Sequence, residues 1–470
     1  MVMVKHKALI PVLAVSSIVL GLVLCVASIP EEFQPPGALF WPALSLSAGL
    51  LIVPILRIRL DDSRAVLRAE NFVLLAFIYW IMLDLIQISY PLQLVDVADV
   101  ELAFTAVAVM AIGLWIGLAM PRWRLPKPLV DAVNVELRSQ QIFTAILFCF
   151  GLSIFYYVYK SDFSLDVLVQ GLQATRWQTA WSRGQLGDSD AFIEHLTYFG
   201  FVLPSLTVLL VRTSPPPGWV NWRVLFSIFL SAIFVAFIAQ SGARRTVGVI
   251  IGAALLTWLG LQPRMKLKNV IITVSVVGCV LFALQNILYM RRFGLEAVLD
   301  DKVAESEKLT YVHVDDNFLR LSQIIHVMPE YFDYVGYKQI LFVLIRPIPR
   351  ALWPDKPIDP GFSLPSMIGW RDNETSLSSS ILGELYATWG LLAVFLGGVF
   401  YGRLVSMWNG ILYGSNTLNG RTFYGLGIMV LFAGIRSMQD LVIMTYGVLG
   451  WMLISTVLGK LRRRIIPSQP

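Results

Sequence analysis

Long apolar runs separated by short polar segments are the dominant pattern along this chain. Because a helix of roughly 20 apolar residues crosses a bilayer, each run of that length predicts a transmembrane helix. The predicted spans are residues 8–28, 37–56, 71–90, 101–119, 141–159, 195–211, 224–240, 246–261, 270–290, 380–401, 422–435 and 441–459. The pattern therefore predicts an all-α polytopic membrane protein of about twelve helices, within a range of roughly 10–14, formed by residues 1–470 as one integral membrane domain. Residues 337–345 predict an additional partial or re-entrant helix.

The first apolar run follows Lys5 and Lys7 and has two interpretations, a cleaved signal peptide or a retained membrane anchor. The apolar stretch is long for a signal peptide, and Leu24 before Cys25 does not fit a lipoprotein cleavage site. We therefore expect a retained anchor.

Basic residues divide the connections between the predicted spans into two sides. Segments 57–68, 122–138, 264–268 and 460–464 are rich in lysine and arginine, and they alternate with connections on the other side. Since cytoplasmic loops carry the excess of basic residues, this pattern predicts that both termini are cytoplasmic. The two long connections, residues 160–194 and 291–379, then become outer loops, and long ordered loops are often functional.

Composition supports a membrane protein and argues against several other classes. Of the residues, 56% are hydrophobic and 14% are charged, with a mean hydropathy of +0.68, whereas a soluble domain carries about a quarter charged residues. The net charge of +6 lies in the connections between spans, so we expect no nucleic-acid partner. The three cysteines lie in apolar runs and the four histidines lack metal-site spacing, so we expect no disulfide, metal or other cofactor.

Several arginines lie on the predicted outer face, against the topological bias, in segments that the backbone holds close to the membrane. They are Arg244 and Arg245 in a very short turn, Arg291 and Arg292 after the ninth span, Arg346 and Arg350 around Pro347–Pro349, and Arg436 in a short hairpin. Arginine binds phosphate oxygens bidentately, so the set predicts a binding site for an anionic substrate. Arg176 and Lys356, in the two long outer loops, are further candidates. The alternative for any single arginine is an interaction with lipid headgroups.

Acidic residues within the predicted spans are candidate partners of these arginines or candidate catalytic groups. Glu384 lies near the outer end of the tenth predicted span, and a carboxylate at membrane depth normally has a partner or a function. We predict that Glu384 is a general base, with an ion pair to one of the arginines as the alternative. Asp84, near Gln87, is interpreted as a structural pair. His313 is a second candidate base, with a surface histidine as the alternative.

Three segments carry a family resemblance. Residues 346–357, RPIPRALWPDKP, resemble the IPR-x-x-WPDKP signature of the O-antigen and exopolysaccharide repeat-unit polymerases, the Wzy family. Residues 378–390, SSSILGELYATWG, are similar to that family's serine-rich approach to a GE-x-Y-x-x-x-G helix. Residues 241–245, SGARR, resemble its SGSR turn, from which Ala243 and Arg245 depart.

The resemblance implies a bacterial inner-membrane glycosyltransferase with its active site facing the periplasm. It implies transfer of a growing glycan from undecaprenyl pyrophosphate to the next lipid-linked repeat unit. The expected partners are the undecaprenyl-pyrophosphate-linked oligosaccharide, membrane lipid, and a flippase and a chain-length regulator of the same pathway. The predicted catalytic residues are then Glu384, Arg350 and Arg346, and the predicted pyrophosphate- and sugar-binding residues are Arg244, Arg245, Arg291, Arg292, Lys356, Trp353, Arg436 and Arg176. Prolines between residues 347 and 360 predict a stiff, extended segment that presents Arg350, Trp353 and Lys356.

Two other functions fit parts of the sequence. An O-antigen ligase performs related chemistry and would centre on an outer-loop histidine, for which His313 is the candidate. A lipid-linked oligosaccharide flippase or other transporter would distribute charge along the bundle interior and relate its two halves by pseudo-symmetry. The charges here concentrate at one face and the halves differ, so the sequence favours the polymerase.

Overall fold

The computed structural model describes residues 2–31, 37–60, 63–87, 95–182, 193–215, 218–262, 266–294, 312–346, 348, 352–353, 355–357, 361–369 and 377–465. All regular secondary structure in these segments is helical. The long helices are α1 (Val2–Ala27), α2 (Phe40–Leu60), α3–α4 (Ala69–Ile86, with a π-helical turn at Ile78–Met82), α5 (Val97–Ala119), α7 (Ser139–Lys160), α10 (Leu203–Thr213, extended by the 3₁₀ helix His195–Val202), α11 (Trp222–Gln240), α12 (Arg244–Gly260), α13 (Leu267–Phe293), α18 (Ser380–Gly414), α19 (Leu418–Gly434) and α20 (Met438–Ile465).

Ten helices in the described part of the chain are long and apolar enough to cross a membrane. Helices α12 and α19 span 17 residues each and are shorter than these ten. The prediction of an all-α, multi-pass membrane protein is therefore confirmed, and the count of twelve spans stays a prediction. The partial helix predicted at residues 337–345 is present as α16 (Lys338–Ile345), which is too short to cross a bilayer.

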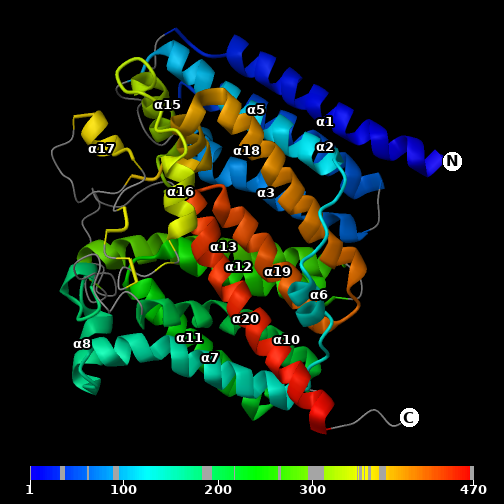
Figure 1. Ribbon diagram of the computed structural model, residues 1–470, viewed down its shortest axis with the longest axis vertical. Coiled ribbons are helices and arrows are strands. Elements are labelled where there is room, and N and C mark those ends of the chain that lie inside the picture. Colours follow the sequence, from blue (N-terminus) through cyan, green and yellow to red (C-terminus); the bar gives the residue numbers. More distant parts are fainter. Residues whose placement is uncertain are drawn as a thin grey trace.

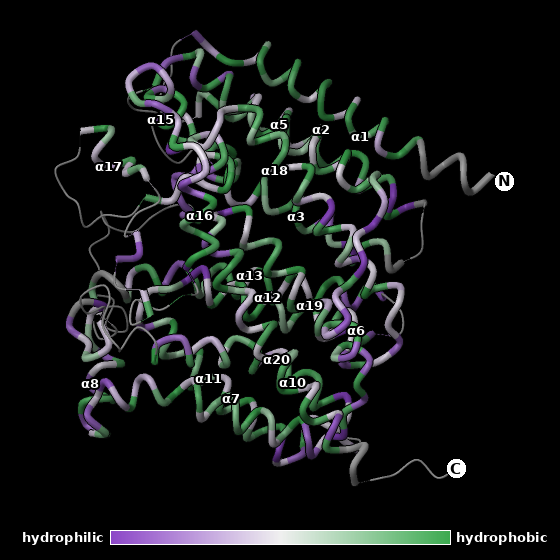
Figure 2. The backbone as a smooth tube through the Cα atoms, in the orientation of Figure 1, coloured by the Kyte–Doolittle hydropathy of each residue, from purple (hydrophilic) through white to green (hydrophobic). Residues whose placement is uncertain are grey.

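The long helices run side by side in a bundle with two distinct ends (Figure 1). The N-terminal part of α1, the C-terminal part of α20 and α6 (Lys127–Val133) lie at one end, which we call the terminal end. Helices α8 (Leu165–Gln173), α15 (Asn317–Val327), α16 and α17 (Leu364–Met367) lie at the other, the loop end. Figure 2 shows apolar residues along the helices and polar residues gathered towards both ends. The N-terminal part of α1 and the C-terminal part of α20 lie at the same end of the bundle, in agreement with the predicted topology. That this end faces the cytoplasm stays a prediction.

Apolar side chains cover much of the outside of the bundle as well as its interior. On α13, Val274 and Phe282 are 65% and 74% exposed, and on α1 Leu20 is 57% exposed. A protein surrounded by water would bury such side chains, whereas lipid tails solvate them at no cost. The surface of the bundle is therefore that of a membrane protein.

Helices α5 and α18 cross at very short range, and this crossing fixes the position of α18. A Cβ atom on Gly117 would lie 2.1 Å from the carbonyl oxygen of Val399, and one on Gly402 would lie 2.1 Å from that of Leu114. With Gly113 and Gly398, these residues form a small-xxx-small pattern on each helix, which allows transmembrane backbones to touch. The crossing anchors the helix that carries Glu384.

A buried polar network joins α2, α3, α18 and α19 at the terminal end. The Glu70 carboxylate accepts hydrogen bonds from Arg57 NH1 at 2.9 Å and from Asn409 Nδ2 at 2.6 Å. The Tyr424 hydroxyl donates to Asn409 Oδ1 at 2.7 Å. Since the side chain of Glu70 is only 4% exposed, these contacts offset the cost of burying its charge.

Candidate functional site

The short connection between α19 and α20, residues 435–437, is the centre of the candidate site. Glu384, the fifth residue of α18, accepts a hydrogen bond from the Ser437 hydroxyl at 2.9 Å and another from the backbone N–H of Met438 at 2.7 Å. The backbone N–H of Ile381 donates to the Ile435 carbonyl at 3.0 Å. Glu384 is half-buried, and its carboxylate both faces this connection and caps the first residue of α20.

Arg436 is held by two carboxylates from different parts of the chain. Its Nε donates to Asp315 Oδ2 at 2.5 Å and its NH1 donates to Asp440 Oδ2 at 2.8 Å. The side chains of Arg436 and Asp440 are 11% and 4% exposed. Burial acts to raise the pKa of Asp315, but Arg436 and Arg244 outweigh it and hold that pKa below its ordinary value. Asp315 is therefore ionised at neutral pH.

Arg244 and Arg245, at the start of α12, approach the same two carboxylates. Arg244 NH2 lies 3.7 Å from Asp315 Oδ1, and Arg245 Nε lies 3.5 Å from Asp440 Oδ1. Arg244 also donates to the backbone carbonyls of His313 (2.6 Å from NH1) and Val314. Arg244 thus holds the backbone of residues 313–314 and also pairs with the carboxylate of Asp315. The side chain of Arg245 is more exposed, at 36%.

The segment 312–316, which precedes α15, is fastened across this end of the bundle by α3–α4. Gln87 forms two hydrogen bonds with the backbone of Val312, and the N–H of Val314 donates to Asp84 Oδ1 at 3.3 Å. The structural interpretation of Asp84 and Gln87 is consistent with these contacts, which place Asp315 beside the arginines. Burial, together with the charge of Arg244, lowers the pKa of His313 below its ordinary value, so its imidazole is neutral at pH 7.

Arg346, at the end of α16, reaches the first turn of α20. The Gln439 amide, oriented with its oxygen towards Arg346, accepts from NH2 at 2.8 Å and from Nε at 3.3 Å. Gln439 follows directly after Ser437 and Met438, which hold Glu384. Arg346 thus joins the same cluster. Lys356 turns back on its own loop, where Nζ donates to the carbonyls of Arg346 at 3.1 Å and Ile348 at 2.8 Å.

A break in α18 shapes the same end of the bundle. Trp389 and Gly390 leave helical geometry, with φ +62° at Gly390. The carbonyls of Ala387 and Thr388, freed by the break, accept from the backbone N–H groups of Val335 (2.9 Å) and Gly336 (3.2 Å). The loop after α15 is therefore docked onto the broken helix, and Trp389 is left 50% exposed.

Four of the predicted arginines are brought together with the predicted base. We call Arg244, Arg245, Arg346, Arg436, Asp315, Asp440 and Glu384 the loop-end cluster. Arg176 is half-buried in a segment that Gln240, at the end of α11, anchors through Ala174 (3.1 Å). Trp353 is 38% exposed. Arg350 and the side chains of Arg291 and Arg292 lie outside the described residues, so their predicted roles stay predictions.

Sequence reasoning missed the two aspartates of this cluster. Asp440 follows Arg436 by four residues at the start of α20, a spacing that brings two side chains together and could have indicated the pair. Asp315 comes from a distant loop, and nothing in its local sequence indicates the contact. Three arginines and two aspartates now share one network, so the excess of positive charge there is smaller than the arginines alone imply.

One group of side chains in the described part of the chain has the composition of a metal site. Asp96, Asp99 and His326 each offer a ligand atom, all within 4.8 Å of one another. Asp99 Oδ2 and His326 Nδ1 are 2.8 Å apart, and the two aspartates form the capping box of α5. Because helix capping and this pair account for both carboxylates, we infer no metal function from the group.

Comparison with known proteins gives no relative. No protein-family model matches the chain, and no match was found among curated proteins or solved structures.

Proposed function

We propose that this protein is an oligosaccharide repeat-unit polymerase of the bacterial inner membrane. It would transfer a growing glycan from undecaprenyl pyrophosphate to the next lipid-linked repeat unit at the periplasmic face. The observation that carries the proposal is the meeting of Glu384 with Arg346 and Arg436 around residues 435–440. The resemblance of residues 346–357 and 378–390 to the Wzy family supplies the substrate class.

The arginines suit the leaving group of this reaction. A pyrophosphate gains negative charge as the glycosidic bond breaks, and preorganised donors at a membrane-level site stabilise that charge. In the proposal, Arg245 and Arg346 meet the pyrophosphate, because the side chain of Arg245 is 36% exposed and Arg346 is only half-buried. Arg436 and Arg244, fixed by Asp315 and by backbone carbonyls, offset the negative charge of the two aspartates beside them. Trp353 and Trp389 offer exposed aromatic faces on which sugar rings can stack.

Glu384 is the proposed general base. The attacking hydroxyl of the acceptor sugar must lose a proton as it bonds to the anomeric carbon of the donor. The Ser437 hydroxyl, now donating to Glu384 Oε1 at 2.9 Å, marks where an acceptor hydroxyl would lie. The hydrogen bond from Met438 keeps the other carboxylate oxygen in place. Glu384 would take the proton, and the pyrophosphate would depart with the bonding electron pair.

Expression of variants in cells that lack the native protein tests this proposal. Cells carrying Glu384→Gln or Arg350→Ala should insert the protein normally and accumulate lipid carrying a single repeat unit. The change of Glu101, an acid on α5 outside the cluster, to Gln is the matched control and should leave polymer ladders intact. Normal ladders from Glu384→Gln would contradict the assignment of the base.

A ligase is the second candidate, because His313 is half-buried within the segment that carries Asp315 and its imidazole is neutral. A ligase would move finished polymer onto a lipid acceptor and would depend on that imidazole. His313→Ala separates the two functions. Lost transfer of finished polymer, with normal chain growth, would favour the ligase, whereas dependence of chain growth on Glu384 favours the polymerase.

A further inference from the structure

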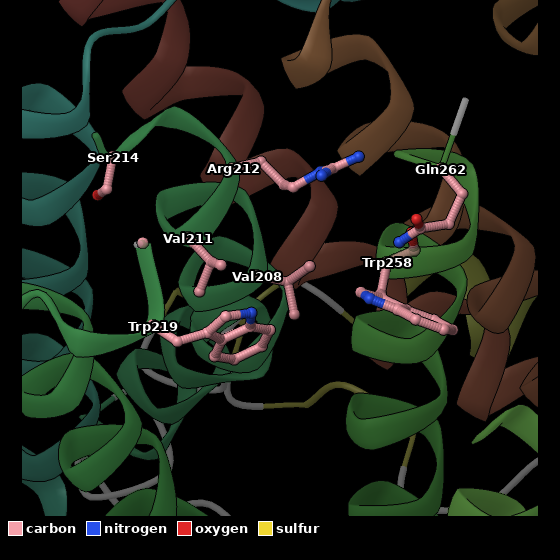
Figure 3. Close-up of a pocket in the computed structure, with 8 residues that line it drawn as sticks. Val208, Val211, Arg212, Ser214, Trp219, Trp258 and Gln262 are labelled. Carbon is pink, nitrogen blue, oxygen red and sulfur yellow. The ribbon is translucent and has the colours of Figure 1, made fainter. Parts of the chain in front are cut away.

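A cavity lies at the terminal end of the bundle, away from the loop-end cluster. Helix α12 begins at Arg244 and ends at Gly260, so its two ends are separated by about 25 Å at a rise of roughly 1.5 Å per residue. Beside its last turn, a cavity of about 240 Å³ is lined by Val208, Val211, Arg212, Ser214, Gly218, Trp219, Trp258 and Gln262 (Figure 3). None of these residues belongs to the proposed polymerase site.

Two indole rings and one guanidinium define the shape of this cavity. Trp219 and Trp258 lie on either side of Val208, and Arg212 extends above them on the side of Gln262 (Figure 3). A Cβ atom on Gly218 would lie 2.5 Å from the Val211 carbonyl oxygen, so glycine lets the turn carrying Trp219 pack against α10. The cavity thus has an apolar floor and a cationic rim.

The charge around the cavity is positive. Arg212 NH2 donates to the Leu261 carbonyl at 2.6 Å, which uses one of the five N–H donors of the guanidinium. Arg421 NH1 donates to the neighbouring Gly260 carbonyl at 3.3 Å. No acidic residue occurs in the sequence from His195 to Leu295, whereas Arg212, Arg223, Lys266 and Lys268 lie at or beside the ends of α10, α11 and α13 near the cavity. The single charged side chain of the lining, Arg212, therefore favours an anionic ligand.

The surrounding side chains place the cavity at the level of lipid headgroups. Trp219, Val220 and Trp222 are 57%, 70% and 64% exposed beside the ends of two helices of the bundle. Exposed tryptophans at helix ends are typical of the boundary between bilayer and water. The volume is below the range of roughly 300–1,000 Å³ of pockets for drug-sized ligands, so it suits a headgroup better than an oligosaccharide.

We propose that this cavity binds the phosphate group of an anionic phospholipid. Arg212 holds the phosphate through N–H groups not used on Leu261, and the Gln262 amide hydrogen-bonds the polar part of the headgroup. Trp219 and Trp258 pack against the glycerol and the first acyl carbons. Basic pockets between transmembrane helices recognise anionic headgroups in this way. The bound lipid fills the space between α10 and α12 at the membrane surface.

Native mass spectrometry of the purified full-length chain in delipidated micelles tests the site. Phosphatidylglycerol, phosphatidylcholine and inorganic phosphate are titrated separately. Arg212→Gln should raise the Kd for one phosphatidylglycerol by about tenfold or more, the effect of losing a charge-assisted hydrogen bond. Trp219→Ala should weaken binding while leaving Arg212 and its contact with Leu261 in place, so its result does not depend on the fold of the arginine variant.

Matched controls come from the same membrane level. Arg223 and Trp222 contact each other and Phe143 without lining the cavity, so Arg223→Gln and Trp222→Ala should leave the Kd within about twofold of wild type. An equal loss of phosphatidylglycerol affinity in Arg212→Gln and Arg223→Gln would show that binding depends only on the overall surface charge, and it would overturn the proposal. Equal binding of phosphatidylcholine, or binding of inorganic phosphate with no lipid bound, would overturn it as well.

Discussion

Replacing Arg436 with glutamine removes the cation that joins the two acids of the loop-end cluster. Its guanidinium contacts Asp315 at 2.5 Å and Asp440 at 2.8 Å, and its side chain is only 11% exposed. Without it, Asp440, at 4% exposed, keeps Arg245 at 3.5 Å as the remaining ion pair among these contacts. Breaking a buried ion pair by removing one partner costs about 3–5 kcal/mol, because a buried charge loses its compensation.

Unfolding of the purified protein in mixed micelles, followed by circular dichroism as the denaturing detergent is increased, measures this cost. Arg245→Gln is the control and should cost about 1 kcal/mol or less, because its ion pair is longer and its side chain is partly solvated. In the double variant Arg436→Gln/Asp440→Asn, part of the loss should be recovered, since the second change removes the uncompensated charge. A loss below about 1 kcal/mol for Arg436→Gln would refute the inferred role of this pair.

Three further predictions use the same unfolding measurement. Arg436 outweighs burial and holds the pKa of Asp315 in the folded state below its ordinary value. The ionised Asp315 therefore stabilises the folded state at every pH above its unfolded pKa of about 3.9, and this stabilisation is lost as the pH falls below that value. The stability difference between wild type and Asp315→Asn should therefore stay constant from pH 8 to about 5 and narrow below about pH 4, and an unchanged difference would contradict this. Gly390→Ala should cost about 1–3 kcal/mol, because φ is +62° there and a Cβ atom would lie 2.8 Å from the Tyr334 hydroxyl; a neutral effect would mean that the break is not strained. Glu70→Ala should cost about 3–5 kcal/mol, because it removes the buried carboxylate that accepts hydrogen bonds from Arg57 and Asn409, and wild-type stability would show that the network is dispensable.

Much of the helical layout was predictable, because bilayer thickness imposes one length on every span. Each of the twelve predicted runs corresponds to a helix or to consecutive helical segments in the described part of the chain. The short helix α16 was also predictable from its apolar stretch before Pro347. The close crossing of α5 and α18 was not predicted, although glycines four residues apart on both helices carry a signal for it.

Of the candidate site, the arginines and Glu384 were predictable, but the two aspartates that pair with the arginines were not. Short turns hold Arg244, Arg245 and Arg436 at one level, so their meeting follows from topology once the spans are known. Asp315 reaches them through a loop fixed by Gln87 and by Arg244 itself, and such long-range contacts leave no periodic pattern in the sequence. The break in α18 was missed because Gly390 lies within a continuous apolar run.

Reconstitution of the purified chain with undecaprenyl-pyrophosphate-linked repeat units is the measurement that tests the central proposal most directly. Liposomes containing the wild-type protein should convert the single-repeat lipid into a ladder of longer glycans with release of undecaprenyl pyrophosphate. Liposomes containing an equally folded Glu384→Gln variant should leave the substrate unchanged. A folded wild-type protein that forms no ladder, or a Glu384→Gln variant that forms a full one, would contradict the proposed chemistry of the loop-end cluster.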